Sequence, residues 1–158
     1  MASWIEEKAE QIKQREEATR KEREWQIHAA QATRSRGKEV VEKLEEAVRA
    51  DVSKWNEKFP NQPNKQIDSV GKHFPNGFKV NKTHYPAFSL YVSFDAESNS
   101  IPYIVVRNRA VDSTSYEERG VFRMHLAEDG NIYLTRHSSP ISFEEASQIL
   151  LEPLLELP

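Results

Sequence analysis

The sequence contains no cysteine, and this absence excludes several kinds of site at once. A disulfide framework, a thiolate metal site and a cysteine nucleophile all require thiol groups. No stretch approaches the roughly 20 apolar residues of a membrane-spanning helix. The first residues turn acidic at Glu6 and Glu7, where a secretory signal would be basic and then apolar. We therefore expect a cytoplasmic protein that does not bind membranes.

Motifs of catalysis and cofactor binding are also missing. The sequence has no Gly-rich phosphate loop, no Gly-x-Ser-x-Gly elbow, no His-Glu-x-x-His pair and no Asp-rich calcium loop. We expect no metal site, no cofactor and no enzymatic activity. An enzyme would require the fold to gather histidines and a carboxylate in one cleft. The histidines are spread over separate predicted elements without the spacing of metal ligands: His28, His73, His84, His125 and His137.

Charge is unevenly distributed along the chain. Residues 1–59 hold 13 basic and 13 acidic residues, residues 60–110 hold 6 and 3, and residues 111–158 hold 3 and 9. The net charges are therefore 0, +3 and −6, which sum to the −3 of the whole chain. A nucleic-acid-binding arm should carry an excess of positive charge, and the N-terminal segment carries none. Nucleic acid is thus a less favoured partner than protein.

The N-terminal segment has the composition of a helix. Glycine and proline are absent from Ser3 to Arg34, and Glu16–Arg20 and Glu17–Lys21 form i,i+4 pairs in the favourable order. Gly37 is the one plausible break, and the sequence leaves open whether the helix continues through it. One continuous helix would extend roughly 80 Å at 1.5 Å per residue, so it would need a partner or a fold back at Gly37.

A second helical pattern follows and ends at Pro60. Apolar residues recur every three or four positions, as in a helix packed on a core: Val41, Leu44, Val48, Val52, Trp55 and Phe59. We divide the chain into a charged helical extension, residues 1–36, and a compact α+β domain, residues 37–158.

Five strands are predicted in the rest of the chain, at 78–81, 88–94, 101–108, 121–126 and 131–136. The last two flank Glu128-Asp129-Gly130, a hairpin signal. The polar stretch 111–119 is interpreted as a loop or short helix. Ser142 and Glu145 form a capping box that starts a C-terminal helix. The fold class is therefore α+β: a long N-terminal helix or helical hairpin, a five-stranded, mainly antiparallel sheet and a C-terminal helix.

A possible ligand site lies on the sheet face opposite the core. Strand alternation places four residues there, and two further residues from the third strand can join them. Aromatic rings interleaved with cations can stack bases or hold a peptide. Coverage of this face by the first helix or by a second subunit is the favoured alternative. The candidate residues are Tyr91, Tyr103, Arg107, Arg123, His125 and Tyr133.

Basic side chains in the middle of the chain offer a related site for an anionic ligand. They are Lys79, Lys82, Arg107 and Arg109. The acidic last third of the chain could equally neutralise them.

Tryptophan in the charged segment is the strongest functional signal. Trp55 belongs to the amphipathic helix and is expected in the core. Trp4 and Trp25, with Ile5 and Ile12, have no core partners within their own segment. Leaving two tryptophans in water is costly, so this segment is expected to contact the domain, a second copy or another protein.

Three functional hypotheses follow. The leading one is a non-enzymatic interaction or scaffold protein that self-associates, for example as a coiled coil, or binds a protein partner through its N-terminal helices. The alternative is a domain that binds a small ligand or nucleic acid on the outer face of its sheet. The third comes from the order of elements, which is similar in layout to small acidic secretion chaperones; that likeness implies a dimer that holds unfolded protein segments.

Overall fold

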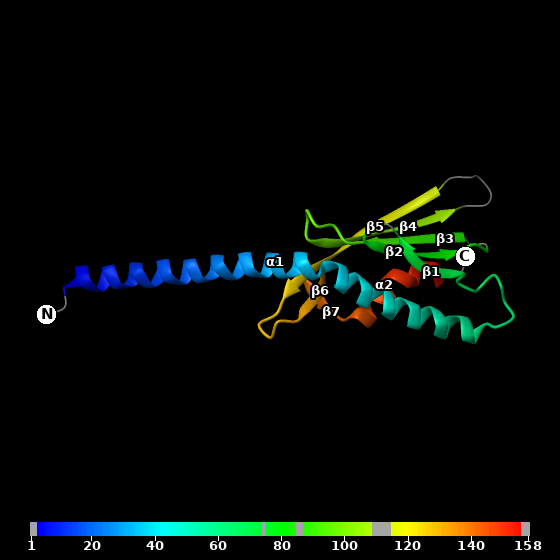
Figure 1. The fold of residues 1–158 in the computed structure, drawn as a ribbon, viewed down its shortest axis with the longest axis horizontal. Helices are drawn as coiled ribbons and strands as arrows, with labels where there is room; N and C mark the ends of the chain where they lie inside the picture. Colours follow the sequence, from blue (N-terminus) through cyan, green and yellow to red (C-terminus); the bar gives the residue numbers. More distant parts are fainter. Residues whose placement is uncertain (1–2, 74, 85–86, 109–114, 156–158) are drawn as a thin grey trace.

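The computed structural model describes residues 3–73, 75–84, 87–108 and 115–155. A long helix leads into a sheet, and a second helix closes the chain (Figure 1). Residues 109–114 are outside the described part, so the predicted basic residue Arg109 and residues 111–114 of the 111–119 stretch are not placed. The elements are α1 (Trp4–Lys58), β1 (Ser69–His73), β2 (Gly77–Lys82), β3 (Ala87–Ser93), β4 (Ser100–Asn108), β5 (Ser115–Leu126), β6 (Ile132–Arg136), β7 (Ser139–Ile141) and α2 (Phe143–Leu155).

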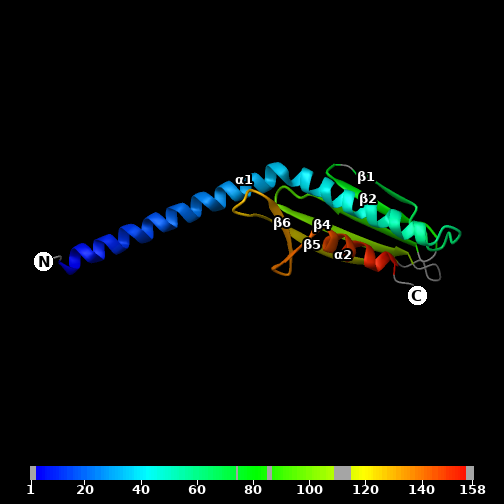
Figure 2. The same ribbon diagram turned by 90° about the horizontal axis from the view of Figure 1, so that it is seen from below.

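Helix α1 is continuous through Gly37 over 55 residues, so the chain does not fold back there. Ser3 caps its first turn by accepting a hydrogen bond from the backbone N–H of Glu6 at 3.4 Å. Glu6 and Glu7 place negative charge at the positive end of the helix dipole. Phe59 terminates the helix directly before Pro60. At 1.5 Å per residue α1 is about 82 Å long, and its first half extends away from the domain (Figures 1 and 2).

The sheet has seven strands rather than the predicted five. They lie in sequence order from β1 to β7, and every neighbouring pair is antiparallel. The two missed strands are the edges. β1 carries Val70 as its only large apolar residue, and β7 has three residues that include Pro140. Edge strands are commonly short, polar or interrupted by proline, so they lack the alternating pattern that identifies a strand.

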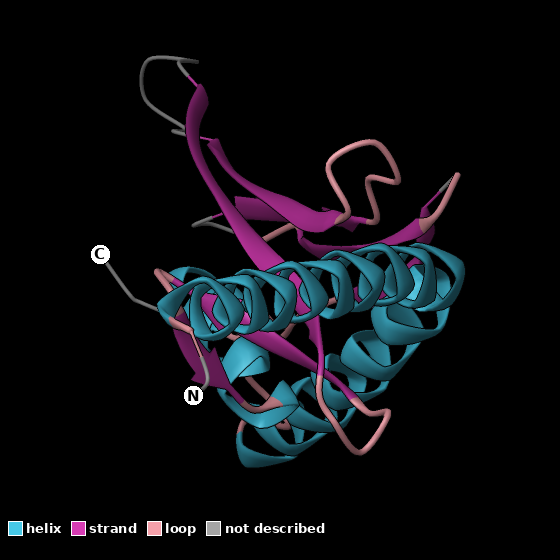
Figure 3. Cartoon of the chain, turned by 90° about the vertical axis from the view of Figure 1, so that its left-hand side faces the viewer, coloured by secondary structure: helices cyan, strands magenta, loops and turns pink. Residues whose placement is uncertain are grey.

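The prediction of a loop or short helix at 111–119 is wrong for residues 115–119. These residues begin β5 and pair with β4, from Ser115 opposite Asn108 to Arg119 opposite Ile104. In Figure 3 this end of the β4–β5 pair rises away from the helices. Because no helix covers this end of β5, its residues can be polar. A polar strand lacks the alternation of apolar residues by which strands are predicted.

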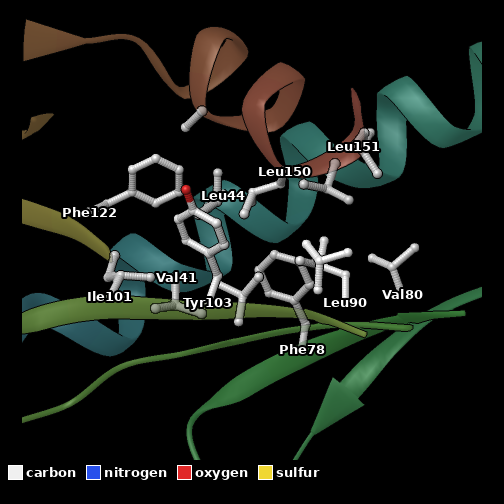
Figure 4. Packing of buried hydrophobic residues seen from close by; sticks show 14 of the residues in the cluster. Val41, Leu44, Phe78, Val80, Leu90, Ile101, Tyr103, Phe122, Leu150 and Leu151 are labelled. Carbon is white, nitrogen blue, oxygen red and sulfur yellow. The ribbon is translucent and has the colours of Figure 1, made fainter. Parts of the chain in front are cut away.

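Both helices pack on one face of the sheet (Figure 4). The amphipathic half of α1 supplies fully buried Leu44 and Val48, and α2 supplies Leu150 and Leu154. Trp55 packs at the margin of this core, where its indole N–H donates to the carbonyl of Lys65 at 2.6 Å. The strands contribute alternating inward side chains, among them Phe78, Val80, Leu90, Val92, Ile101, Tyr103 and Phe122.

Two predicted local motifs are confirmed. The turn at 127–131 joins β5 to β6, with Gly130 at a positive φ of 87°. In the capping box of α2, Ser142 Oγ accepts from the N–H of Glu145 at 3.0 Å, and Glu145 accepts from the N–H of Ser142 at 3.3 Å. The sequence therefore encodes both boundaries locally.

Helix α1 meets the domain at two turns near Thr33, which is its first buried residue. The side-chain amide of Asn99, in the β3–β4 turn, donates to the hydroxyl of Thr33. Arg36 donates to the backbone carbonyl of Gly130, in the β5–β6 turn, at 2.7 Å. Within the described part of the chain, no side-chain hydrogen bond joins residues 4–32 to the domain. None of the described helices is long and apolar enough to cross a membrane.

Candidate functional sites

The projecting part of α1, residues 4–32, is the first candidate site. We call it the projecting helix. Its large apolar side chains stand in solvent: Trp4 is 74% exposed, Ile5 59%, Ile12 44%, Trp25 39% and Ile27 60%. Trp25 contacts only His28 of its own helix among aromatic groups, with ring centroids 5.8 Å apart. The four residues predicted for protein contact, Trp4, Ile5, Ile12 and Trp25, are thus placed clear of the domain.

These side chains divide between two faces of the projecting helix. A helix turns about 100° per residue, so Ile5 and Ile12, seven positions apart, lie within about 20° of each other. Trp4 and Trp25 lie within about 60° of each other on a neighbouring face by the same count. Ile27 falls on the Ile5 and Ile12 face. Ile27 was not among the residues predicted for protein contact, although its spacing from Ile12 would have allowed it.

Charge changes sign along the projecting helix and its entry into the domain. Residues 4–12 hold Glu6, Glu7 and Glu10 against a single Lys8, a net charge of −2. Residues 25–38 hold three basic residues, Arg34, Arg36 and Lys38, and no acidic residue, a net charge of +3. The zero net charge of residues 1–59 therefore conceals an acidic stretch at residues 4–12 and a basic stretch at residues 25–38.

The second candidate site is a cavity of about 490 Å³ on the outer face of β5, β6 and β7. We call it the β5–β7 cavity. Four of the six residues predicted for ligand binding line it: Tyr103, Arg123, His125 and Tyr133. Arg119, Arg136 and His137 line it too, and none of its described lining residues is acidic. Ligand cavities commonly occupy about 300–1,000 Å³.

Side chains on the floor of the β5–β7 cavity hold one another in place. The rings of His125 and Tyr133 stack, with centroids 5.3 Å apart and planes at 23°. His125 Nε2 and the hydroxyl of Thr135 are hydrogen-bonded at 2.9 Å. His125 and Tyr133 occupy directly opposite positions of β5 and β6, so the strand register itself creates the stack.

A tight turn forms the rim. His137 and Ser138 connect β6 to β7 with φ of 51° and 67°, both in the left-handed region. A two-residue hairpin turn needs this conformation, for which Asn-Gly is the usual sequence. Residues other than glycine are uncommon in this region, and histidine is among those that adopt it more often.

The remaining predicted ligand residues lie elsewhere. Tyr91, on β3, contacts His73 edge-on at 5.2 Å and carries Lys79 over its ring at 5.0 Å. Arg107 lies over the ring of Phe88 at 4.8 Å. Tyr103 does line the cavity, but it is only 6% exposed and packs in the core against Phe122, so its ring does not stand on the outer face with Arg123, His125 and Tyr133. The six residues are therefore not one site.

Arg119, Arg136 and His137 were not among the residues predicted to bind a ligand. One signal was available: Arg119, Arg123 and Arg136 are the three basic residues of the acidic stretch 111–158, apart from histidine. All three line the same cavity. Among the residues that the structure describes, no group of three or more histidine or acidic side chains could hold a metal ion.

The fold and these two sites define an α+β protein with a sequentially ordered antiparallel sheet and a projecting helix. Comparisons with protein-family models, with curated proteins and with solved structures found no match to this chain. Functional inference therefore rests on the chain's own geometry.

Proposed function

We propose that this chain is a non-enzymatic protein-interaction protein that self-associates, two copies pairing through their projecting helices as an antiparallel coiled coil. The observation that carries the proposal is the exposure of Ile5, Ile12 and Ile27 on one face of the projecting helix. A helix of this kind gains most of its stability from packing an apolar face.

The pairing face is defined by residues three and four positions apart, which a helix brings into one stripe. We call it the isoleucine face. It also carries two small residues, Ala9 and Ala30, that allow close approach of a second helix. Its members are Ile5, Ala9, Ile12, Glu16, Thr19, Arg23, Ile27, Ala30 and Arg34.

An antiparallel arrangement makes the isoleucine face complementary to itself. With the two-fold axis between residues 19 and 20, Ile12 of each copy lies opposite Ile27 of the other. Ala9 lies opposite Ala30, and Glu16 opposite Arg23. Each contact occurs twice, as required of a two-fold interface. The same arrangement sets the acidic beginning of one helix beside the basic end of the other, which lowers the electrostatic energy of the pair.

The strength of the pair can be bounded. Fully burying an isoleucine gains about 1.5–3 kcal/mol, and these side chains are already partly covered, so each gains about 1 kcal/mol. Association itself costs about 4–15 kcal/mol. Six isoleucines and two pairs of opposite charges exceed the lower end of that cost, so we expect weak, concentration-dependent dimers.

Sedimentation equilibrium of the full chain over a concentration series tests the proposal. We expect the mass to rise from the monomer value of 18.3 kDa toward twice that value. Ile12→Gln keeps a good helix former and removes two apolar contacts per dimer, so it should leave the chain monomeric. Lys21→Glu, a charge reversal on the opposite side of the helix, is the control and should leave the mass unchanged.

Charge exchange tests the direction of pairing. Arg23→Glu places two like-charged pairs in the antiparallel dimer and should weaken it, and the double variant Glu16→Arg with Arg23→Glu should restore it. In a parallel pair Arg23 would face Arg23, so the single change would cause no loss. A monomer at every concentration would overturn the proposal. Loss of the dimer in Trp25→Gln but not in Ile12→Gln would show that the other face is used.

A further inference from the structure

We propose that the β5–β7 cavity binds a small phosphorylated compound that carries a planar ring, of the nucleoside phosphate class. This inference goes beyond the proposed pairing of helices and uses a different part of the molecule. It rests on the composition of the cavity, on the arrangement of its rings and on the turn at its rim.

Positive charge is concentrated in the cavity. The stretch 111–158 has a net charge of −6, yet its three arginines all line this one cavity. Arg119 forms an ion pair with Glu117 at 3.1 Å, and both side chains are well exposed. Arg123 and Arg136 form no ion pair with a residue that the structure describes. The charges of Arg123 and Arg136 are not neutralised in this way, so an anion that enters the cavity is attracted to them.

The kind of anion follows from the donors. A guanidinium presents a planar fork of N–H groups that matches the oxygens of phosphate or carboxylate. Three guanidiniums can serve the several oxygens of a phosphate group, which offers more acceptors than a single carboxylate. The hydroxyl of Thr135, already paired with His125, lies among the residues that line the same space.

A flat surface lies beside these donors. Tyr133 stacks on His125, which holds the tyrosine ring in place. The side chain of Tyr133 is still 39% exposed to solvent. An aromatic face held in this way can stack a nucleobase or a similar ring, and such stacking contributes about 1–3 kcal/mol per base. The cavity thus offers arginine side chains to the phosphate of a nucleoside phosphate and an aromatic ring to its base.

The β6–β7 turn fixes the rim. His137 lines the cavity with its backbone held at a φ of 51°. Asparagine and glycine are the residues most often found at such a position in a two-residue hairpin turn. A contact with the ligand would explain why histidine occupies a position for which the turn alone favours asparagine.

Titration of the full chain with adenosine 5′-monophosphate, pyrophosphate and adenosine, followed by backbone NMR and calorimetry, tests the inference. We expect the monophosphate to bind most tightly and to shift amide signals of β5, β6 and β7. Arg123→Gln and Arg136→Gln should each lower the affinity for the monophosphate by about 10- to 100-fold, the effect of losing one charge-assisted hydrogen bond. Lys79→Gln removes a cation from the same sheet face outside the cavity and should have no effect.

A ring variant separates the two halves of the ligand. Tyr133→Leu should lower the affinity for the monophosphate severalfold and leave the affinity for pyrophosphate unchanged. The spectrum of each ligand-free variant should keep the wild-type pattern, which distinguishes a lost contact from a lost fold. The monomeric Ile12→Gln chain should bind as the wild type does, so failure of helix pairing and failure of this site are separable.

Several results would overturn the inference. Absence of monophosphate binding is one, and equal weakening in Arg123→Gln and Lys79→Gln is another. Tight binding of single-stranded oligonucleotides with no binding of the mononucleotide would instead assign the cavity to nucleic acid.

Discussion

The phenyl ring of Phe94 lies directly on the backbone of Gly37, the one glycine of α1. A Cβ atom at Gly37 would come within 2.3 Å of the ring carbon Cε2, so any side chain there would clash with the ring. Glycine normally weakens a helix by about 1 kcal/mol relative to alanine. Helix α1 nevertheless continues through Gly37. The close approach of Phe94 explains why this position holds a glycine, since any Cβ atom would meet the ring.

Gly37→Ala should therefore destabilise the protein. The gain in helix propensity is outweighed by forced displacement of Phe94, and overpacking of this kind costs about 1–3 kcal/mol. Urea unfolding measures the change. Gly71→Ala is the matched control, because a Cβ there meets nothing within 4 Å. Stabilisation by Gly37→Ala would mean that the ring moves aside at little cost.

Ser142→Ala should remove the N-cap of α2 and lower the free energy of unfolding by about 0.5–2 kcal/mol. The serine oxygen accepts from the N–H of Glu145, which otherwise has no partner in the first turn. Ser139→Ala, in the exposed strand β7, is the control. A double-mutant cycle with Glu145→Ala should show coupling, and strictly additive losses would contradict a reciprocal cap.

Acidification should reveal the contact between Asp68 and Thr83. Burial raises the pKa of the Asp68 carboxyl, but hydrogen bonds from the Thr83 hydroxyl at 2.7 Å and backbone N–H at 2.5 Å outweigh burial and hold that pKa below its ordinary value. The contact stabilises the folded state fully above the ordinary pKa of about 3.9, and the stabilisation is lost as pH falls through the lowered pKa.

Carboxyl NMR titration of Asp68 in two variants checks this point. Thr83→Val removes the hydroxyl donor and should raise the pKa of Asp68 toward its ordinary value. Thr83→Ser keeps the donor and should leave that pKa low. Equal pKa values in both variants would assign the shift to the backbone N–H alone.

Proline in the projecting helix should separate association from folding. Ala18→Pro breaks a helix at a cost of about 3 kcal/mol, yet residue 18 is exposed and lies in the projecting helix. We expect dimers to be lost and the domain's own unfolding, measured at low protein concentration, to stay within about 0.5 kcal/mol of wild type. Leu44→Ala, in the buried half of the same helix, should cost about 2–5 kcal/mol. A comparable loss from Ala18→Pro would mean that α1 unfolds as a single unit.

Local signals in the sequence predicted the fold well where they were strong. The α2 capping box and the Asp129-Gly130 turn each involve neighbouring residues, so their geometry is decided within a few positions. The edge strands and the start of β5 depend on pairing with β2, β6 and β4. Their polar residues carried no pattern that marks a strand without its neighbour.

The candidate sites show the same division. Alternation along a strand correctly brought Arg123, His125 and Tyr133 to one face. It could not show that Tyr103 turns into the core, or that a turn carries His137 to the same cavity, because both depend on strand register and on a rare backbone conformation. Isoleucine spacing on α1 was visible, but its meaning depended on the helix continuing through Gly37.

The order of the strands has a consequence for synthesis on the ribosome. Helix α1 emerges first, and its apolar half is complete at residue 58, whereas α2 is complete only at residue 155. At about 5–20 residues per second, roughly 5–20 s pass before the last covering element arrives. During that interval the strands can add one hairpin at a time, each beside its predecessor. The nascent chain must meanwhile keep Leu44 and Val48 from premature contacts with other molecules.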